Sequence, residues 1–364
     1  MTKFLEELER KFDSSKNNHF GVENYDPYFR SLFGVRQTKR GLVRKTKDLL
    51  LKLEMLKKFQ HARKKKLFLS KNVEVFEFLY SLLEDGYSRQ TLVDLVAYLV
   101  LGREKVKLNL NSTGFWAGYA SLDNLANRDD FIDSHFLHNF LYAFDLSSLG
   151  YPLKLHGTIP GINNIFLLKQ YEYSHDGNFV GVKPGDYVVD AGACWGDSVL
   201  FFSHRAGPTG RVFAFDISDE NIKILKRNLD QNYCQNVDII SLALDNISGR
   251  SVSIDGSGPA TSIKHTEVSS ESVGKTITLD DFVKENGIKK IDFIKMDIEG
   301  SEVGALLGAK AIIKRNKPRM AISAYHRLGD YAEIPKVIKS FDPSYRFCFD
   351  HFTIHTGESV IFCW

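Results

Sequence analysis

The chain has 364 residues, of which 43% are hydrophobic and 26% charged, and its net charge at neutral pH is +3. This composition is typical of a globular protein with a sizeable core, and the length favours two compact units. The four cysteines are scattered without a CxxC pair, which argues against a disulfide scaffold or a structural zinc site and fits a reducing compartment. The N-terminal segment does not resemble a secretory signal, and the longest apolar stretch is too short to span a bilayer. We therefore expect a cytoplasmic protein.

Residues 1–150 show mostly helical patterns. Apolar residues recur with a 3.6-residue period over 72–102, interrupted at Gly86, and again over 129–144. We interpret residues 1–150 as a mostly helical N-terminal domain, with a helix expected at 129–144.

A basic run lies within this N-terminal part. Residues 36–66 contain thirteen lysines and arginines against two acids, with leucines at roughly helical spacing. Such a helix could contact an anionic membrane surface, a nucleic-acid backbone or a protein partner. Our preferred interpretation is a solvated helix that packs on its leucine side.

From residue 151 the pattern changes to short apolar strands, and from 186 strands and helices alternate. This alternation is typical of a doubly wound α/β sheet with helices on both faces. We assign 151–364 to this second domain, with lead-in strands over 151–180 and a closing antiparallel strand pair at the C-terminus. The expected core strands are 186–192, 210–216, 237–244, 291–297 and 319–325.

Ligands of such sheets bind outside the carboxyl ends of the strands. Several residues capable of binding or chemistry directly follow expected strands, and they should therefore meet at one edge. They are Asp190, Gly192 and Gly196 after the first strand, Asp216 after the second, Asp297 and Glu299 after the fourth, and His326 after the fifth.

The glycine spacing after the first strand distinguishes between ligands. A dinucleotide fingerprint is GxGxxG, whereas this loop reads Asp190-x-Gly192-x-x-x-Gly196, with Cys194 where the middle glycine would be. An acid at the strand end would repel a pyrophosphate but would suit the cationic sulfonium and ammonium of S-adenosylmethionine. Asp216 ends the second strand, where a carboxylate binds ribose hydroxyls in either ligand class.

The sequence resembles the FkbM-type S-adenosylmethionine-dependent methyltransferases over roughly residues 180–364. The resemblance is carried by VVDAGACWGDS, GRVFAFD, KMDIEGSE and AISAYHRLGDYAEIPKVI. It implies a class I methyltransferase fold, S-adenosyl-L-methionine as cofactor, and O-methylation of sugar, glycan or secondary-metabolite hydroxyls. The positions assigned to cofactor binding are Asp190, Gly192, Ala193, Gly196, Asp197 and Asp216, to which we add Ala243 and Leu244 at the end of the third strand.

Three residues are candidates for removing the proton of the acceptor hydroxyl: Asp297, Glu299 and His326. The ordinary pKa of histidine, near ~6.5, suits proton transfer at neutral pH. Asp297, Glu299 and Glu302 have a rival role as ligands of a divalent cation. Carboxylates alone are weak evidence for a metal, and we expect none.

The partner we expect is a small-molecule or glycan acceptor, selected with the help of the N-terminal domain. The alternative function is a nucleic-acid methyltransferase or binding protein that uses residues 36–66; we do not favour it. An NAD-dependent oxidoreductase is disfavoured by the glycine spacing, and a non-catalytic scaffold by the acids at the strand ends. An oligomer is compatible with the sequence.

Overall fold

The computed structural model describes residues 2–20, 24, 67–134, 136, 140–265 and 273–364. The basic run 36–66 lies outside the described residues, so its helix and its contacts stay predictions. Among the helices that are described, none is both long and apolar enough to cross a membrane.

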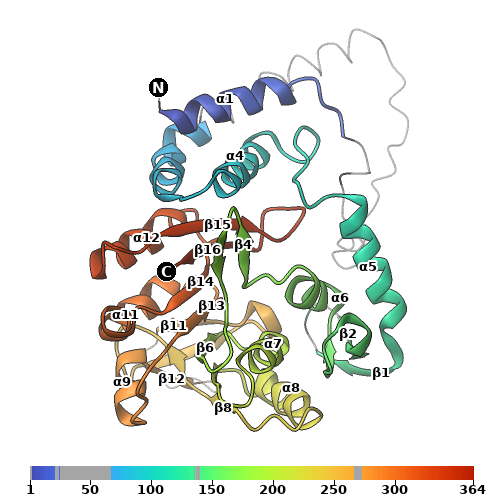
Figure 1. Ribbon diagram of the computed structural model, residues 1–364, viewed down its shortest axis with the longest axis vertical. Helices are drawn as coiled ribbons and strands as arrows, with labels where there is room; N and C mark the ends of the chain where they lie inside the picture. Colours follow the sequence, from blue (N-terminus) through green and yellow to red (C-terminus); the bar gives the residue numbers. More distant parts are fainter. Residues whose placement is uncertain (1, 21–23, 25–66, 135, 137–139, 266–272) are drawn as a thin grey trace.

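A seven-stranded sheet forms the centre of the second half of the chain (Figure 1). Its order is β15-β16-β14-β13-β6-β7-β8, so the chain leaves the central strand β6 first in one direction and later in the other. Strand β16 runs antiparallel to β14 and β15, which confirms the expected closing pair. The strands are β6 (Tyr187–Ala191), β7 (Arg211–Phe215), β8 (Val237–Ile240), β13 (Phe293–Met296), β14 (Arg319–Ser323), β15 (Phe347–His351) and β16 (Ser359–Cys363).

Helices cover both faces of this sheet, as the alternating pattern predicts. Neighbouring residues of β6 show the two faces, because Val188 lies in one buried cluster and Val189 in the other. In Figure 1, α7 (Asp197–Ala206) and α8 (Asp219–Asp230) lie on one side of the sheet. On the other side lie α9 (Leu279–Glu285), α11 (Lys310–Asn316) and α12 (Asp330–Phe341), and α10 (Glu302–Leu307) shares their buried cluster.

The N-terminal helices lie beside the β15 edge of the sheet, where the last of them packs on β15 and the first packs on the last. They are α1 (Lys3–Ser15), a helical stretch over 67–82 and α4 (Gly86–Leu101). The backbone N–H of Glu84 donates to the carbonyl of Phe347 at 2.9 Å. Phe76 is fully buried and belongs to the same hydrophobic cluster as Phe349 and Tyr331. The helical part therefore shares its core with the sheet.

The helix expected at 129–144 is wrong. This segment forms β1 (Asn127–Asp133) and β2 (Phe140–Asp145), which join β3 (Lys154–Gly157) in a three-stranded antiparallel sheet after α5 (Thr113–Leu125). Tyr142 pairs with Gly157, a partner outside the segment, and β1 contains a bulge that disturbs strict alternation. The pairing of β2 with β3 also crosses the boundary expected at residue 150.

Two other expected strands differ from the structure. Within the lead-in 151–180, the apolar residues after Thr158 form α6 (Ile159–Ile162) and a π-helical turn, η3 (Asn163–Leu167), before the hairpin of β4 (Tyr173–His175) and β5 (Asn178–Val180). The expected third strand, 237–244, divides into β8 and β9 (Ala243–Leu244). Strand β9 belongs to a separate sheet with β10 (Ser251–Asp255), β11 (Ser262–His265) and β12 (Val273–Ile277).

Candidate active site

The loop after β6 depends on two glycines in the left-handed region. Gly192 has φ +83°, and a Cβ there would lie 1.9 Å from the carbonyl oxygen of Asp297. Gly196 has φ +91°, and its Cβ would lie 2.4 Å from Leu225 Cδ1. Both conformations favour glycine, and at Gly192 the backbone oxygen of Asp297 leaves no space for any other residue. The loop therefore passes directly against the end of β13.

Asp190, near the end of β6, supports this loop from the protein interior. It is fully buried and pairs with Lys295 Nζ at 2.9 Å, while Ser198 Oγ donates to its second oxygen at 2.7 Å. Lys295 also donates to the carbonyls of Ala191 and Gly192. Burial alone would lower the pKa of Lys295, but the charges of Asp190 and Asp297 raise it. Lys295 and Asp190 thus form a structural ion pair, and Asp190 has a supporting position rather than one facing a ligand.

Replacing Lys295 by methionine should destabilise the protein strongly. The change leaves the Asp190 carboxylate buried without its cation, which typically costs roughly 3–5 kcal/mol. Urea denaturation measures the loss. Lys264→Met is the matched control, because it removes only an exposed ion pair with Asp255 and should change the midpoint little. Equal midpoints for the two variants would contradict the role given to Lys295.

Asp216 binds the same loop from the end of β7. Its carboxylate accepts from the backbone N–H of Cys194 at 2.8 Å and of Ser218 at 2.9 Å, and the side chain of Asn221 lies at 3.3 Å. Burial raises the pKa of Asp216 to about 6, although these hydrogen bonds favour the ionised form. The carboxylate is therefore charged at neutral pH.

Two cavities meet where β6 and β13 end. The first is narrow and lies between the loops after β6 and β7 and the small sheet, with Gly192, Asp216, Ile217, Ala243, Leu244 and Asp297 in its lining. The second, of about 350 Å³, extends towards α5, α6 and the β15–β16 loop, with Asp197, Lys295, Asp297, Glu299, Tyr325 and Glu358 in its lining. Gly192 and Asp297 line both cavities and so mark their junction.

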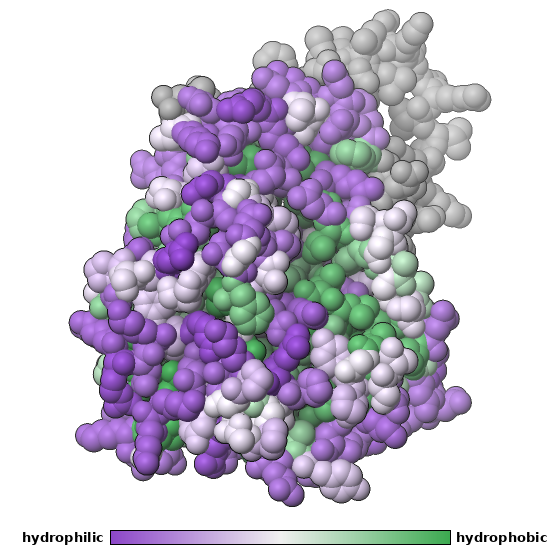
Figure 2. Space-filling view, in the orientation of Figure 1, coloured by the Kyte–Doolittle hydropathy of each residue, from purple (hydrophilic) through white to green (hydrophobic). Residues whose placement is uncertain are grey.

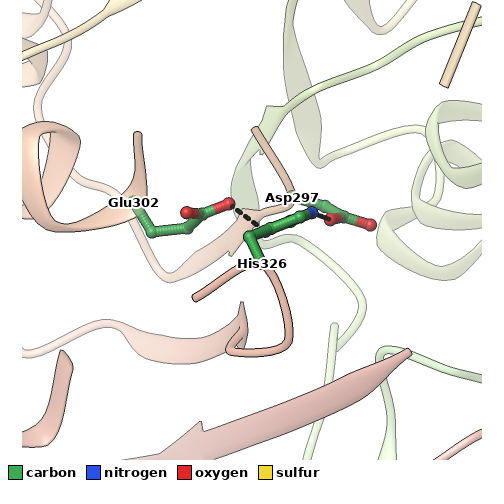
Figure 3. A group of neighbouring side chains, drawn as sticks. All are labelled: Asp297, Glu302 and His326. Carbon is green, nitrogen blue, oxygen red and sulfur yellow. Dashed lines mark ion pairs between the residues drawn. The ribbon is translucent and has the colours of Figure 1, made fainter. Parts of the chain in front are cut away.

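An imidazole stands between carboxylates beside this junction (Figure 3). His326 Nδ1 lies 3.0 Å from Glu302, and Nε2 lies 3.4 Å from Asp297 and 3.3 Å from Glu299. Burial alone would lower the pKa of His326, but contacts with Glu299 and Glu302 and the charge of Asp297 raise it to about 11. These acids and His326 could also hold a metal ion, since Asp297, Glu302 and His326 offer ligand atoms within 4.8 Å of one another. Because both ring nitrogens face carboxylates, we interpret the group as an ion-pair cluster.

This pKa gives a test with a definite sign. A group whose pKa is raised on folding stabilises the protein fully below its unfolded value, near ~6.5 for histidine, and loses that effect as the pH rises towards about 11. We expect His326→Gln to lower the urea midpoint, and the difference from wild type to narrow as the pH rises above ~6.5. A difference that widens with pH would contradict the ion-pair cluster.

The structure brings most of the predicted site residues to the two cavities. Gly192, Asp216, Ala243, Leu244 and Asp297 line the first, and Asp197 and Glu299 line the second. The other four, Asp190, Ala193, Gly196 and His326, are not among the lining residues and lie behind them. The individual roles of all these residues stay predictions.

Residues 190–347 match the family model described as the methyltransferase FkbM domain. These residues form an FkbM methyltransferase domain. The match covers β6 to β15 and contains both cavity-forming loops, the acid cluster and His326. The domain therefore belongs to the S-adenosyl-L-methionine-dependent methyltransferases.

One solved structure supports the fold of the FkbM domain. The structure of methyltransferase FkbM from Methylobacillus flagellatus KT is 20% identical, with a TM-score of 0.51, over 81% of this chain and 60% of that chain. This chain thus corresponds to less than two thirds of that protein. A putative rRNA methylase from Clostridium thermocellum (18% identity, TM-score 0.33, 50% of this chain and 87% of that chain) is more distant. So is Aeropyrum pernix fibrillarin with bound S-adenosyl-L-methionine (10% identity, TM-score 0.33, 62% of this chain and 90% of that chain).

The first cavity of the FkbM domain fits its cofactor, S-adenosyl-L-methionine. The adenosine half has apolar surface and hydroxyls, and the cavity offers the aliphatic side chains of Ile217 and Leu244 with the Asp216 carboxylate. Gly192 has no side chain where the backbone must approach a ligand, and a Cβ there would meet the carbonyl of Asp297. The residues present are therefore compatible with this cofactor.

Sequence reasoning missed several residues of the second cavity. Tyr171 and Tyr325 both donate to Asp297, at 2.8 and 3.1 Å, and Glu358 lies on the β15–β16 loop next to Gln170. Tyr325 directly precedes His326 and could have been found from the strand-end rule. The other residues come from loops outside the β/α alternation and left no such signal.

Proposed function

We propose that this protein transfers a methyl group to a hydroxyl of a sugar, glycan or secondary-metabolite acceptor held in the second cavity. The observation that carries the proposal is the position of Asp297, which lines both cavities where they meet. An acceptor in the second cavity would thus be next to a cofactor in the first. The family resemblance supports oxygen as the methyl acceptor.

The residues of the first cavity would hold the cofactor. Asp216 would accept hydrogen bonds from the ribose hydroxyls, and Ala243 and Leu244 would contact the adenine. Asp197, the first residue of α7, would lie towards the methionine end in the second cavity. When bound, S-adenosylmethionine supplies a methyl group activated by the sulfonium, and the broken sulfur–carbon bond leaves its electron pair on S-adenosylhomocysteine.

The acids at the junction would orient the acceptor hydroxyl and take its proton. Asp297 already accepts from Tyr171 and Tyr325, so its orientation is fixed. Glu299 has a side chain 29% exposed and contacts His326, which leaves acceptor capacity towards the cavity. We assign Glu299 as proton acceptor and Asp297 as the group that positions the hydroxyl. His326, charged because of the surrounding acids, would hold both carboxylates in place rather than act as the base.

The test is formation of S-adenosylhomocysteine from S-adenosylmethionine in the presence of a panel of methyl glycosides. Glu299→Gln should lower kcat by ~10²–10⁴ and leave the affinity for S-adenosylhomocysteine unchanged. Glu333→Gln, an exposed acid on α12, is the matched control and should behave as wild type. A normal kcat in Glu299→Gln would overturn the role of Glu299 as proton acceptor. If none of the glycosides in the panel supports turnover, the proposal of a sugar acceptor is overturned.

A further inference from the structure

The far side of the second cavity is formed by the loop between β15 and β16. This loop places Thr353, His355 and Glu358 in the lining. Glu358 has φ +58°, an unfavourable conformation for a residue with a side chain, and its carboxylate accepts from the amide of Gln170. Burial and the charge of Asp297 raise the pKa of Glu358 to about 8. Glu358 is thus held near Asp297 and Glu299, with its backbone in an unfavourable left-handed conformation.

Acidic side chains outnumber basic ones in the cavity lining. Asp297, Glu299 and Glu358 line its acceptor side, and Asp197 lies near the α7 start. Among the described residues that line it, Lys295 is the only lysine or arginine, and its charge is paired with Asp190 at 2.9 Å. His326, behind the lining, balances one of the three acids on the acceptor side. Like charges this close are unfavourable, so Glu358, with a pKa of about 8, keeps its proton at neutral pH until a cation binds beside it.

Four side chains in the cavity lining that can donate hydrogen bonds are already engaged. Tyr171 and Tyr325 donate to Asp297, Gln170 donates to Glu358, and Lys295 donates to two backbone carbonyls. The cavity therefore offers acceptor oxygens on Glu299 and, once it is ionised, on Glu358. A ligand rich in donors satisfies that capacity, whereas a phosphate or carboxylate does not.

Aromatic side chains complete the cavity. Trp195 lies 6.5 Å from Phe136 in an edge-on arrangement, and Tyr119 of α5 lines the same space. In Figure 2 an apolar band covers the region beside α5 where Figure 1 draws α6. Aromatic faces bind the apolar faces of sugar rings and also attract organic cations.

We propose that the acceptor of this enzyme is a hydroxyl-bearing molecule with a protonated amine, of the amino-sugar type, whose ammonium group binds between Glu358 and Glu299. This inference rests on the proposed function, because it names the acceptor class of the same site. Methyl transfer goes to the hydroxyl: the oxygen–carbon bond forms as the sulfur–carbon bond breaks, and the hydroxyl proton passes to Glu299. The ammonium is bound and is not methylated.

Calorimetric titration of the full chain, loaded with S-adenosylhomocysteine, tests the proposal with three methyl glycosides that share one pyranose ring. These are methyl glucosaminide, its N-acetyl derivative and methyl glucuronide, which are cationic, neutral and anionic at neutral pH. We expect the glucosaminide to bind about tenfold more tightly than the N-acetyl derivative, since hydrogen bonds to charged groups are the stronger ones. The glucuronide should bind most weakly.

Glu358→Gln should remove about tenfold of the affinity for the glucosaminide and leave binding of S-adenosylhomocysteine unchanged. Glu333→Gln should change neither. If S-adenosylhomocysteine does not bind to wild type, the proposed function itself fails. If it binds but the glucosaminide does not bind, or has no advantage over the other two probes, the acceptor class proposed here is wrong while methyl transfer stands.

Discussion

Asp216→Ala is expected to abolish binding of S-adenosylhomocysteine, with a loss of affinity of about 100-fold or more. The carboxylate would accept two ribose hydroxyls, and hydrogen bonds to a charged group contribute roughly 1.5–3 kcal/mol each. The same carboxylate holds the N–H of Cys194, so its removal also loosens the glycine loop. Isothermal titration calorimetry on wild type and variant measures the difference.

A matched control is Asp230→Asn, an exposed acid at the end of α8, which should bind S-adenosylhomocysteine as wild type does. The pKa of about 6 adds a second check. Because the ionised carboxylate is the hydrogen-bond acceptor, the affinity of wild type should fall as the pH decreases through 6. A folded Asp216→Ala protein with unchanged affinity would show that the cofactor binds elsewhere.

Gly192→Ala is expected to destabilise the protein by more than about 3 kcal/mol and to remove cofactor binding. Its φ is +83°, and the added Cβ would lie 1.9 Å from a backbone oxygen, that of Asp297, which cannot swing away. Relief requires that the loop and the end of β13 separate, and the cavities meet at that point. Thermal or urea denaturation measures the loss of stability.

Gly249→Ala separates the two causes. Gly249 has almost the same φ, +81°, but nothing lies within 4 Å of its added Cβ. In this variant only the unfavourable backbone conformation should lower the free energy of unfolding, by about 1–2 kcal/mol, and cofactor affinity should stay normal. Similar losses in both variants would mean that backbone conformation, and not the contact with Asp297, determines the requirement for Gly192.

The strand-end residues were predictable because the alternation of strands and helices can be recognised from the local sequence pattern. Parallel strands place their carboxyl ends at one edge, so Gly192, Asp216 and Asp297 meet once the alternation is recognised. A helix cap is equally local: the hydroxyl of Thr278 accepts from the N–H of Asp281 at 3.0 Å. These predictions needed only the strand and helix pattern.

Other features depend on contacts between distant segments. The apolar spacing at 129–144 suits a helix, but pairing with β3 makes it two strands. His326 looked suitable as a base at its ordinary pKa, and only the fold places three carboxylates around it. Asp190 looked like a ligand contact, and its burial with Lys295 became visible only in the structure. Glu358 lies 61 residues after Asp297, in a loop whose path no periodicity indicates.

The central claim is that the edge formed by β6, β7 and β13 binds S-adenosylmethionine and not a dinucleotide. The most direct measurement is calorimetric titration of the wild-type chain with S-adenosylhomocysteine and with NAD at neutral pH. We predict binding of one S-adenosylhomocysteine per chain and no heat of binding with NAD. Binding of NAD, or no binding of S-adenosylhomocysteine by the folded protein, would contradict the account.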